Sequence, residues 1–91
     1  MLTYQVAYRM QTGAFFAEVP DFPEASALGA SLSEARQNVV SSLKSAAERK
    51  LRRGEMLPIP DPHRAQPDAY LVERVLLLPL DFDRVEARVT G

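Results

Sequence analysis

The segment Pro20-Asp21-Phe22-Pro23 constrains the fold of this chain more than any other stretch. A proline at each end fixes φ twice and removes two backbone N–H donors, so the segment cannot continue a β-ladder and must form a rigid turn. Gly29 follows the turn and permits a close or left-handed backbone, and Ser31-Leu32-Ser33-Glu34 is the capping box typical of a helix N-terminus. We therefore expect a strand, a turn, a second strand and a helix start within Ala14–Glu34.

Alternation with a period of two predicts a hairpin at the start of the chain. Thr3–Gln11 alternates polar with apolar residues, and Gln11-Thr12-Gly13-Ala14 is a turn signal. The returning strand, Ala14–Val19, has Phe15 and Phe16 on opposite faces. A short third strand of small residues is expected at Ala25–Leu28.

The second half of the chain predicts one further buried strand. Tyr70–Leu78 is apolar on both faces apart from Glu73 and Arg74, and Pro79 ends it. Residues 80–91 alternate again, with Val85, Ala87 and Val89 on one side. They fit either a short extra C-terminal strand or a frayed tail.

A long amphipathic helix is predicted from Leu32 to Arg53, about 22 residues or roughly 33 Å. Gly54 supplies its C-terminal stop. Arg36 does not fit this pattern, because helical periodicity places this charged residue inside the apolar arc. Its guanidinium either reaches the rim of that arc or meets an acid on a partner chain. With the strands, this helix gives a single α+β domain in the order β-β-β-α-β.

Composition limits the remaining possibilities. The 91 residues contain no cysteine, which excludes disulfides and thiolate metal sites, and the net charge is −1. Residues 35–54 are basic, and Arg49, Lys50, Arg52 and Arg53 fall in the last helical turns. These cations either complement the helix dipole, which we favour, or contact nucleic acid.

The sequence shows no targeting segment. Its start lacks a basic stretch followed by an apolar run, and the longest apolar run, Val75–Leu80, is too short to span a bilayer. We therefore expect a cytoplasmic protein without a membrane association. Between the helix and the last buried strand, Glu55–Asp68 contains four prolines and the single histidine, His63. This composition predicts an extended connector on which His63 is a surface residue.

The motifs of Phe15–Pro60 resemble those of the HicB-type antitoxins. Members of that family show an aromatic residue, a turn like A-E-V-P-D-x-P-G, a short strand, and G-D-T-L-E-E-A opening a helix that carries an Asn. The corresponding segments here are Phe15, Ala17–Pro23, Gly29–Ala35, Asn38, and Gly54-Glu55 leading to Pro58. The chain departs from the pattern with Glu24 in place of Gly, Ala30 in place of Asp, and Arg36 in place of an apolar residue.

The resemblance implies a partial ribonuclease-H-like fold for residues 1–79, with residues 80–91 as a C-terminal extension. In that fold the last strand lies beside the first, and we expect a right-handed crossover through the helix. Many relatives carry a DNA-binding module after this domain. The 12 residues from Leu80 to Gly91 are too few for one, so we expect no sequence-specific DNA binding by this chain.

Catalysis is not expected. A metal-dependent nuclease site needs converging carboxylates, one of them on the first strand, and residues 3–11 contain no acid. One histidine and no cysteine exclude the familiar nucleophilic sets unless a partner completes them. We expect neither a metal nor a cofactor.

Protein binding is the favoured hypothesis, because one helix covers only one face of a four-stranded sheet. An apolar face or edge left open is met by another chain, so we expect a homodimer, a higher homo-oligomer or a heterocomplex. The resemblance implies an antitoxin that neutralises a small basic HicA-type mRNA-cleaving toxin. The candidate partner-binding residues are Phe16, Glu18, Asp21, Glu24 and Arg36.

Three alternatives remain at this point. The acids near the turn are equally compatible with ordinary solvated positions. The second-ranked function is a stand-alone HicB-like oligomerising scaffold or regulatory module without a toxin. Weak RNA binding through the basic end of the helix is a third possibility, and it would depend steeply on salt.

Overall fold

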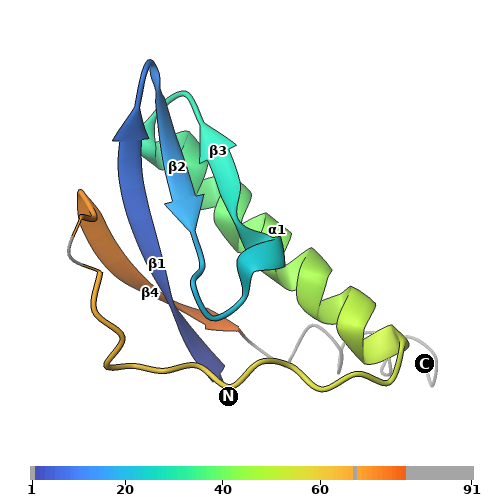
Figure 1. Cartoon of the computed structure of the whole chain (residues 1–91). Helices are drawn as coiled ribbons and strands as arrows, with labels where there is room; N and C mark the ends of the chain where they lie inside the picture. The colour runs from blue at the N-terminus through green and yellow to red at the C-terminus, as the bar shows by residue number, and fades with distance from the viewer. Residues whose placement is uncertain (1, 67, 78–91) are drawn as a thin grey trace.

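The sheet has four strands and is covered on one face by a single helix (Figure 1). The computed structural model describes residues 2–66 and 68–77. Its elements are β1 (Leu2–Gln11), β2 (Ala14–Glu18), the 3-10 helix η1 (Pro23–Ala25), β3 (Ala27–Gly29), α1 (Leu32–Arg52) and β4 (Leu71–Leu77). The spatial order is β3-β2-β1-β4 and every neighbouring pair is antiparallel. The predicted α+β class and element order are confirmed.

The hairpin of β1 and β2 has the predicted faces. Gly13 has a φ of 71°, which lets the chain reverse tightly. Tyr8 lies opposite Ala17 and Met10 opposite Phe15, so these residues share one face, while Phe16 lies opposite Arg9 on the other.

The proline-bounded segment forms a turn, as predicted, but the turn extends further along the chain. The Val19 carbonyl accepts a hydrogen bond from Phe22 N at 2.9 Å, and Pro23–Ala25 then form η1. The third strand therefore begins at Ala27 rather than at the predicted Ala25. Phe22 is buried, with its ring centroid 5.6 Å from that of Tyr4.

Both ends of α1 are capped by the residues that the sequence indicated. Ser31 Oγ accepts from Glu34 N at 3.1 Å, and Glu34 Oε1 accepts from Ala30 N at 2.8 Å. At the other end Gly54 has a φ of 73°, and Glu55 N donates to the Lys50 carbonyl at 2.9 Å. This is a Schellman-type ending, which satisfies a carbonyl that the helix leaves unpaired.

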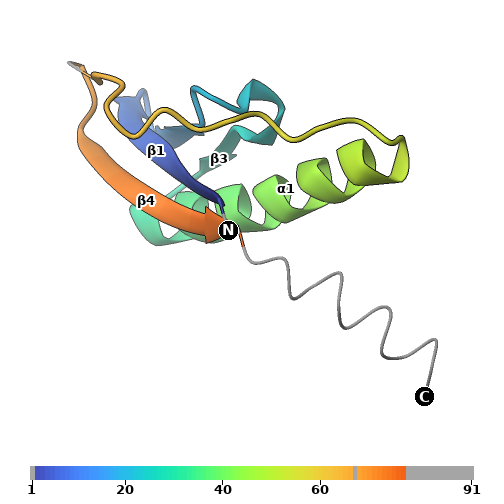
Figure 2. The ribbon, with the colours of Figure 1, turned by 90° about the horizontal axis from the view of Figure 1, so that it is seen from below.

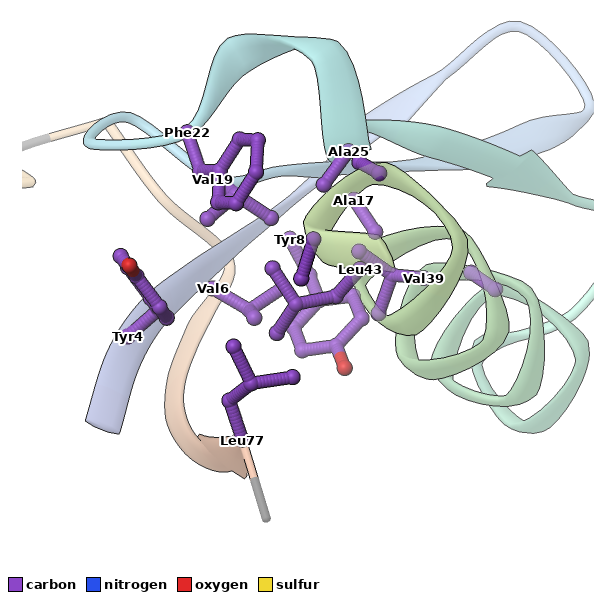
Figure 3. Close-up of a cluster of buried hydrophobic side chains, with 13 residues drawn as sticks. Tyr4, Val6, Tyr8, Ala17, Val19, Phe22, Ala25, Val39, Leu43 and Leu77 are labelled. Carbon is purple, nitrogen blue, oxygen red and sulfur yellow. The ribbon is translucent and has the colours of Figure 1, made fainter. Parts of the chain in front are cut away.

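The core lies between α1 and the face of the sheet that carries the even-numbered residues of β1 (Figure 3). Tyr4, Val6 and Tyr8 are fully buried there. Val39 and Leu43 of α1 and Leu77 of β4 point into the same cluster. The apolar arc predicted for the helix is confirmed by its buried residues, which are Ala35, Val39, Leu43, Ala46 and Ala47.

The connector between α1 and β4 runs beneath the strands and returns along the sheet (Figures 1 and 2). It is fastened to β1, because Tyr4 Oη donates to the Pro58 carbonyl and Gln5 Nε2 donates to the Pro62 carbonyl at 2.7 Å. This return path makes β4 antiparallel to β1 and opposite in direction to β3. The handedness rule for crossovers concerns parallel strands, so the predicted right-handed crossover from the third strand to the fourth is wrong.

Several predictions made from the sequence lie outside the described residues. They are the end of the fourth strand at Leu78 and Pro79, the possible strand around Val85–Val89, and the boundary of the extension at residues 80–91. Within the described chain, no helix is both long enough and apolar enough to cross a membrane.

Candidate functional site

The sheet face opposite α1 carries three of the four large apolar side chains that are exposed on the described strands; the fourth, Met10, lies on the helix side near the end of β1. The register places Phe16 beside Leu28, and it places Val72 and Leu76 opposite Ala7 and Thr3, all on this face. Leu28 is 56% exposed, Val72 42% and Leu76 46%. We call the surface made by Phe16, Leu28, Val72 and Leu76 the open face. Phe16 is half-buried there, and Phe15 packs against the core on the other side.

Glu18 is part of the open face but is already paired. Arg9 Nη1 donates to Glu18 Oε1 at 2.8 Å, and the two side chains keep 28% and 39% of their surface exposed. The pair lies between the apolar residues of β2 and those of β4. A partner covering the open face would therefore meet a neutralised pair rather than a free acid.

Asp21 has an internal role that the sequence did not reveal. Its Oδ2 accepts from Asp61 N at 2.8 Å, and its Oδ1 accepts from Arg64 Nε at 2.7 Å. The Asp21 side chain is only 6% exposed. Asp21 therefore joins the proline-bounded turn to the connector.

Glu24 lies on η1, away from Glu18. Its carboxylate is 3.2 Å from Lys50 Nζ near the C-terminal end of α1. Lys50 also lies 3.5 Å from Glu55 and sits over the Phe22 ring. The structure thus places the three predicted acids in three different ion pairs and does not bring them together.

Arg36 keeps 43% of its side-chain surface exposed, which agrees with a guanidinium at the rim of the apolar arc, and no acid of a partner chain is needed to pair it. Its Nε and Nη2 donate to Glu73 Oε1 and Oε2 at 2.9 and 2.6 Å, so the acid it meets belongs to β4 of the same chain. These hydrogen bonds lower the pKa of Glu73, and the pairing with Glu73 raises the pKa of Arg36. The pair holds α1 to β4 on the helix side of the sheet.

Two shallow hollows flank β4 and α1. One, of about 390 Å³, is lined by Thr3, Gln5, Pro62, His63 and Arg74 on the open side of the sheet. The other, of about 400 Å³, is lined on α1 by Arg36, Gln37, Val40, Ser41 and Lys44. Among the described residues, no three His, Cys, Asp or Glu side chains are grouped so that they could hold a metal ion.

Comparison with known proteins gives a clear result only at the level of structure. No protein-family model matches the sequence, and no curated protein matches it. The fold is similar to the crystal structure of the N-terminal domain of the antitoxin HicB from Burkholderia pseudomallei, with a TM-score of 0.72. That match has 18% identity and covers 85% of this chain and 99% of the other. The chain has the fold of the HicB N-terminal domain.

The full-length HicB antitoxin of the same organism is also similar, with a TM-score of 0.70 and 16% identity. The match covers 99% of this chain and 84% of HicB. Both solved structures are described as antitoxins, so the predicted resemblance is confirmed for the fold. In this HicB-like fold, Phe16 and Glu18 lie on the open face. Asp21 lies in the proline-bounded turn and Glu24 lies on η1, so both are outside the strands. Arg36 lies on the helix side of the sheet.

One member of the Arg36 pair was missed at the sequence level. Glu73 interrupts an otherwise apolar strand, just as Arg36 interrupts the apolar arc of the helix. When an apolar strand and the apolar face of a helix each carry one charge of opposite sign, the two charges are expected to pair. The reason is that a charge among apolar residues is costly unless an opposite charge lies beside it. Asp21 offered no comparable signal, because its partners Asp61 and Arg64 lie about 40 residues away.

Proposed function

We propose that this chain is a non-catalytic, cytoplasmic protein-binding module, and specifically an antitoxin that neutralises a small basic HicA-type toxin. The observation that carries the proposal is the similarity to two antitoxin structures over nearly the whole chain. The open face supports it, because a sheet with exposed apolar side chains on one side offers a surface for another protein.

The open face is the proposed contact surface, with Phe16 and Leu28 side by side on β2 and β3. Glu18 and Glu24 keep 39% and 49% of their side-chain surface exposed, so both can still reach a cationic partner from their ion pairs. Asp21 and Arg36 contribute indirectly, since Asp21 is nearly enclosed and Arg36 is bound to Glu73. Complementary charge at the rim would favour fast association with a basic toxin.

The test is co-expression with a neighbouring reading frame that encodes a small basic protein. We expect that protein alone to arrest growth and this chain to restore growth, with the two proteins purifying together. Leu28→Glu should abolish the rescue, because it places a charge on the open face. Ile59→Glu is the matched control: Ile59 is 82% exposed, and it belongs to the connector rather than to a strand. Failure of rescue by the natural chain, or equal rescue by both variants, would contradict the proposal.

Self-association is the second proposal, and the same surface supports it. A homodimer or larger homo-oligomer would cover the exposed side chains of Leu28, Val72 and Leu76 without a toxin, as a stand-alone scaffold would. The two functions are separated by the growth assay. A scaffold associates with itself but restores growth in no co-expression pair.

A further inference from the structure

The sheet ends in two edge strands, and they differ in how they are protected. β3 has only three residues, and Asn38 Nδ2 donates to its Leu28 carbonyl at 2.8 Å. β4 has seven residues and is the outermost strand on the other side, as Figure 1 shows. No described residue pairs with the outer side of β4. An unpaired strand of this length presents a row of backbone donors and acceptors to an added strand.

The side chains of β4 define what such a strand would have to carry. On the open face, Val72 and Leu76 are exposed and flank Arg74. Arg74 makes no hydrogen bond or ion pair with any described residue, in contrast to Arg9, Arg36 and Arg64. The hollow of about 390 Å³ borders Arg74 on its inner side, so the guanidinium has space around it.

A second copy of β4 is a poor occupant of this edge. Two antiparallel copies related by a two-fold axis place residues of the same face opposite each other. Within β4, such a pairing can set Arg74 opposite Val72, Arg74 or Leu76, but never opposite a carboxylate, because Glu73 lies on the other face of the strand. Two of these registers also set Arg74 against Arg74 or Glu73 against Glu73, and like charges directly opposite each other destabilise a strand pair.

We propose that the outer edge of β4 is a strand-addition site for an extended segment of a partner protein, with an Asp or Glu opposite Arg74 and an apolar residue two positions to either side. Backbone hydrogen bonds supply the affinity and the alternating side chains supply the selectivity. Val72 and Leu76 take the apolar residues, and Arg74 takes the carboxylate. The site does not depend on the partner being a toxin.

The test is a titration of the full-length, isotope-labelled chain with the peptide Thr-Val-Thr-Asp-Thr-Val-Thr, followed by NMR. We expect amide shifts concentrated in Leu71–Leu77 and slower amide exchange there. The same peptide with Lys in place of Asp should bind about tenfold more weakly, which corresponds to about 1.4 kcal/mol. Arg74→Glu should reverse this preference, and because Arg74 is exposed the variant keeps the fold.

Three results would overturn the proposal. One is equal binding of the Asp and Lys peptides, and another is a set of shifts that lies outside β4. The third is light scattering that shows a dimer whose protected amides are those of Leu71–Leu77, since a second copy would then occupy the edge.

Discussion

At the scale of single residues, Gly29 is the point where helix and sheet approach most closely. A Cβ built on Gly29 would lie 2.2 Å from Ala35 N and 2.7 Å from Ala35 Cα, and backbone atoms cannot give way as a flexible side chain would. We expect Gly29→Ala to lower the free energy of unfolding by about 3 kcal/mol, measured by urea denaturation.

Gly13→Ala is the control for this prediction. Gly13 has a φ of 71°, and an added methyl group would have open space around it. The free energy of unfolding should therefore fall only by the cost of a left-handed alanine, about 1–2 kcal/mol. A loss at Gly29 no larger than that at Gly13 would show that the helix shifts at little cost.

Tyr8 makes stability depend on pH in the alkaline range. Burial, with a smaller contribution from the Glu73 carboxylate, raises the pKa of Tyr8 to about 12 from an ordinary value of 10.0. Since the folded state holds this proton more tightly, its stabilising contribution is complete below pH 10 and is lost as the pH rises toward 12. The loss expected from this shift is on the order of 2 kcal/mol.

Tyr8→Phe isolates this effect. Tyr8 Oη is buried and no described residue gives it a well-formed hydrogen bond, so the variant should stay within about 1 kcal/mol of the natural chain at pH 7. Above pH 10 the variant should lose less stability in urea denaturation. The stability of the variant should still fall somewhat as the pH rises, because burial also raises the pKa of Tyr4. Parallel stability profiles for the two proteins would contradict the assignment to Tyr8.

At the scale of elements, Asp21 makes the connector part of the fold. Its side chain is 6% exposed and bonds both Asp61 N and the Arg64 guanidinium. Asp21→Ala should lower the free energy of unfolding by about 2 kcal/mol and accelerate amide exchange at Asp61. Glu24→Gln is the control, since its ion pair with Lys50 is about half exposed on the acid side and should contribute less than about 1 kcal/mol. Equal effects would show that Asp21 does not fasten the connector.

The elements were predictable where local chemistry decides them. Ser31, Glu34 and Gly54 mark the ends of α1, because capping depends on residues within one turn. The start of the third strand was placed two residues too early, since the tendency of Pro23–Ala25 to form a 3-10 turn competes with extension. The direction of β4 was not predictable, because it depends on how the connector is fastened to Tyr4, Gln5 and Asp21.

At the scale of the whole molecule, an open sheet face was predictable and its detailed chemistry was not. One helix for four strands leaves a face uncovered whatever the register. The alternation of β2 predicted that Phe15 and Phe16 lie on opposite faces, and the register places Phe16 on the uncovered one. The ion pairs of Glu18, Glu24 and Arg36 depend on which strands and helices become neighbours. The charged candidate residues were predicted to act together because they are close in the sequence. The structure places them apart, in separate ion pairs.

The open face gives the last prediction, which concerns association of the whole chain. Its largest exposed side chains are apolar, and its central charges, Arg9 and Glu18, neutralise each other. Arg74 adds a positive charge to the same face in each copy, which gives no attraction between copies for salt to screen. Self-association through this face should be detectable by light scattering at micromolar concentration and should change little with added salt, because screening weakens charge–charge attraction but not apolar burial. Leu28→Glu should shift the chain toward monomer, whereas Ile59→Glu should leave the molar mass unchanged. A monomer at every concentration, or a complex that salt dissociates, would show that the open face alone does not hold two copies together.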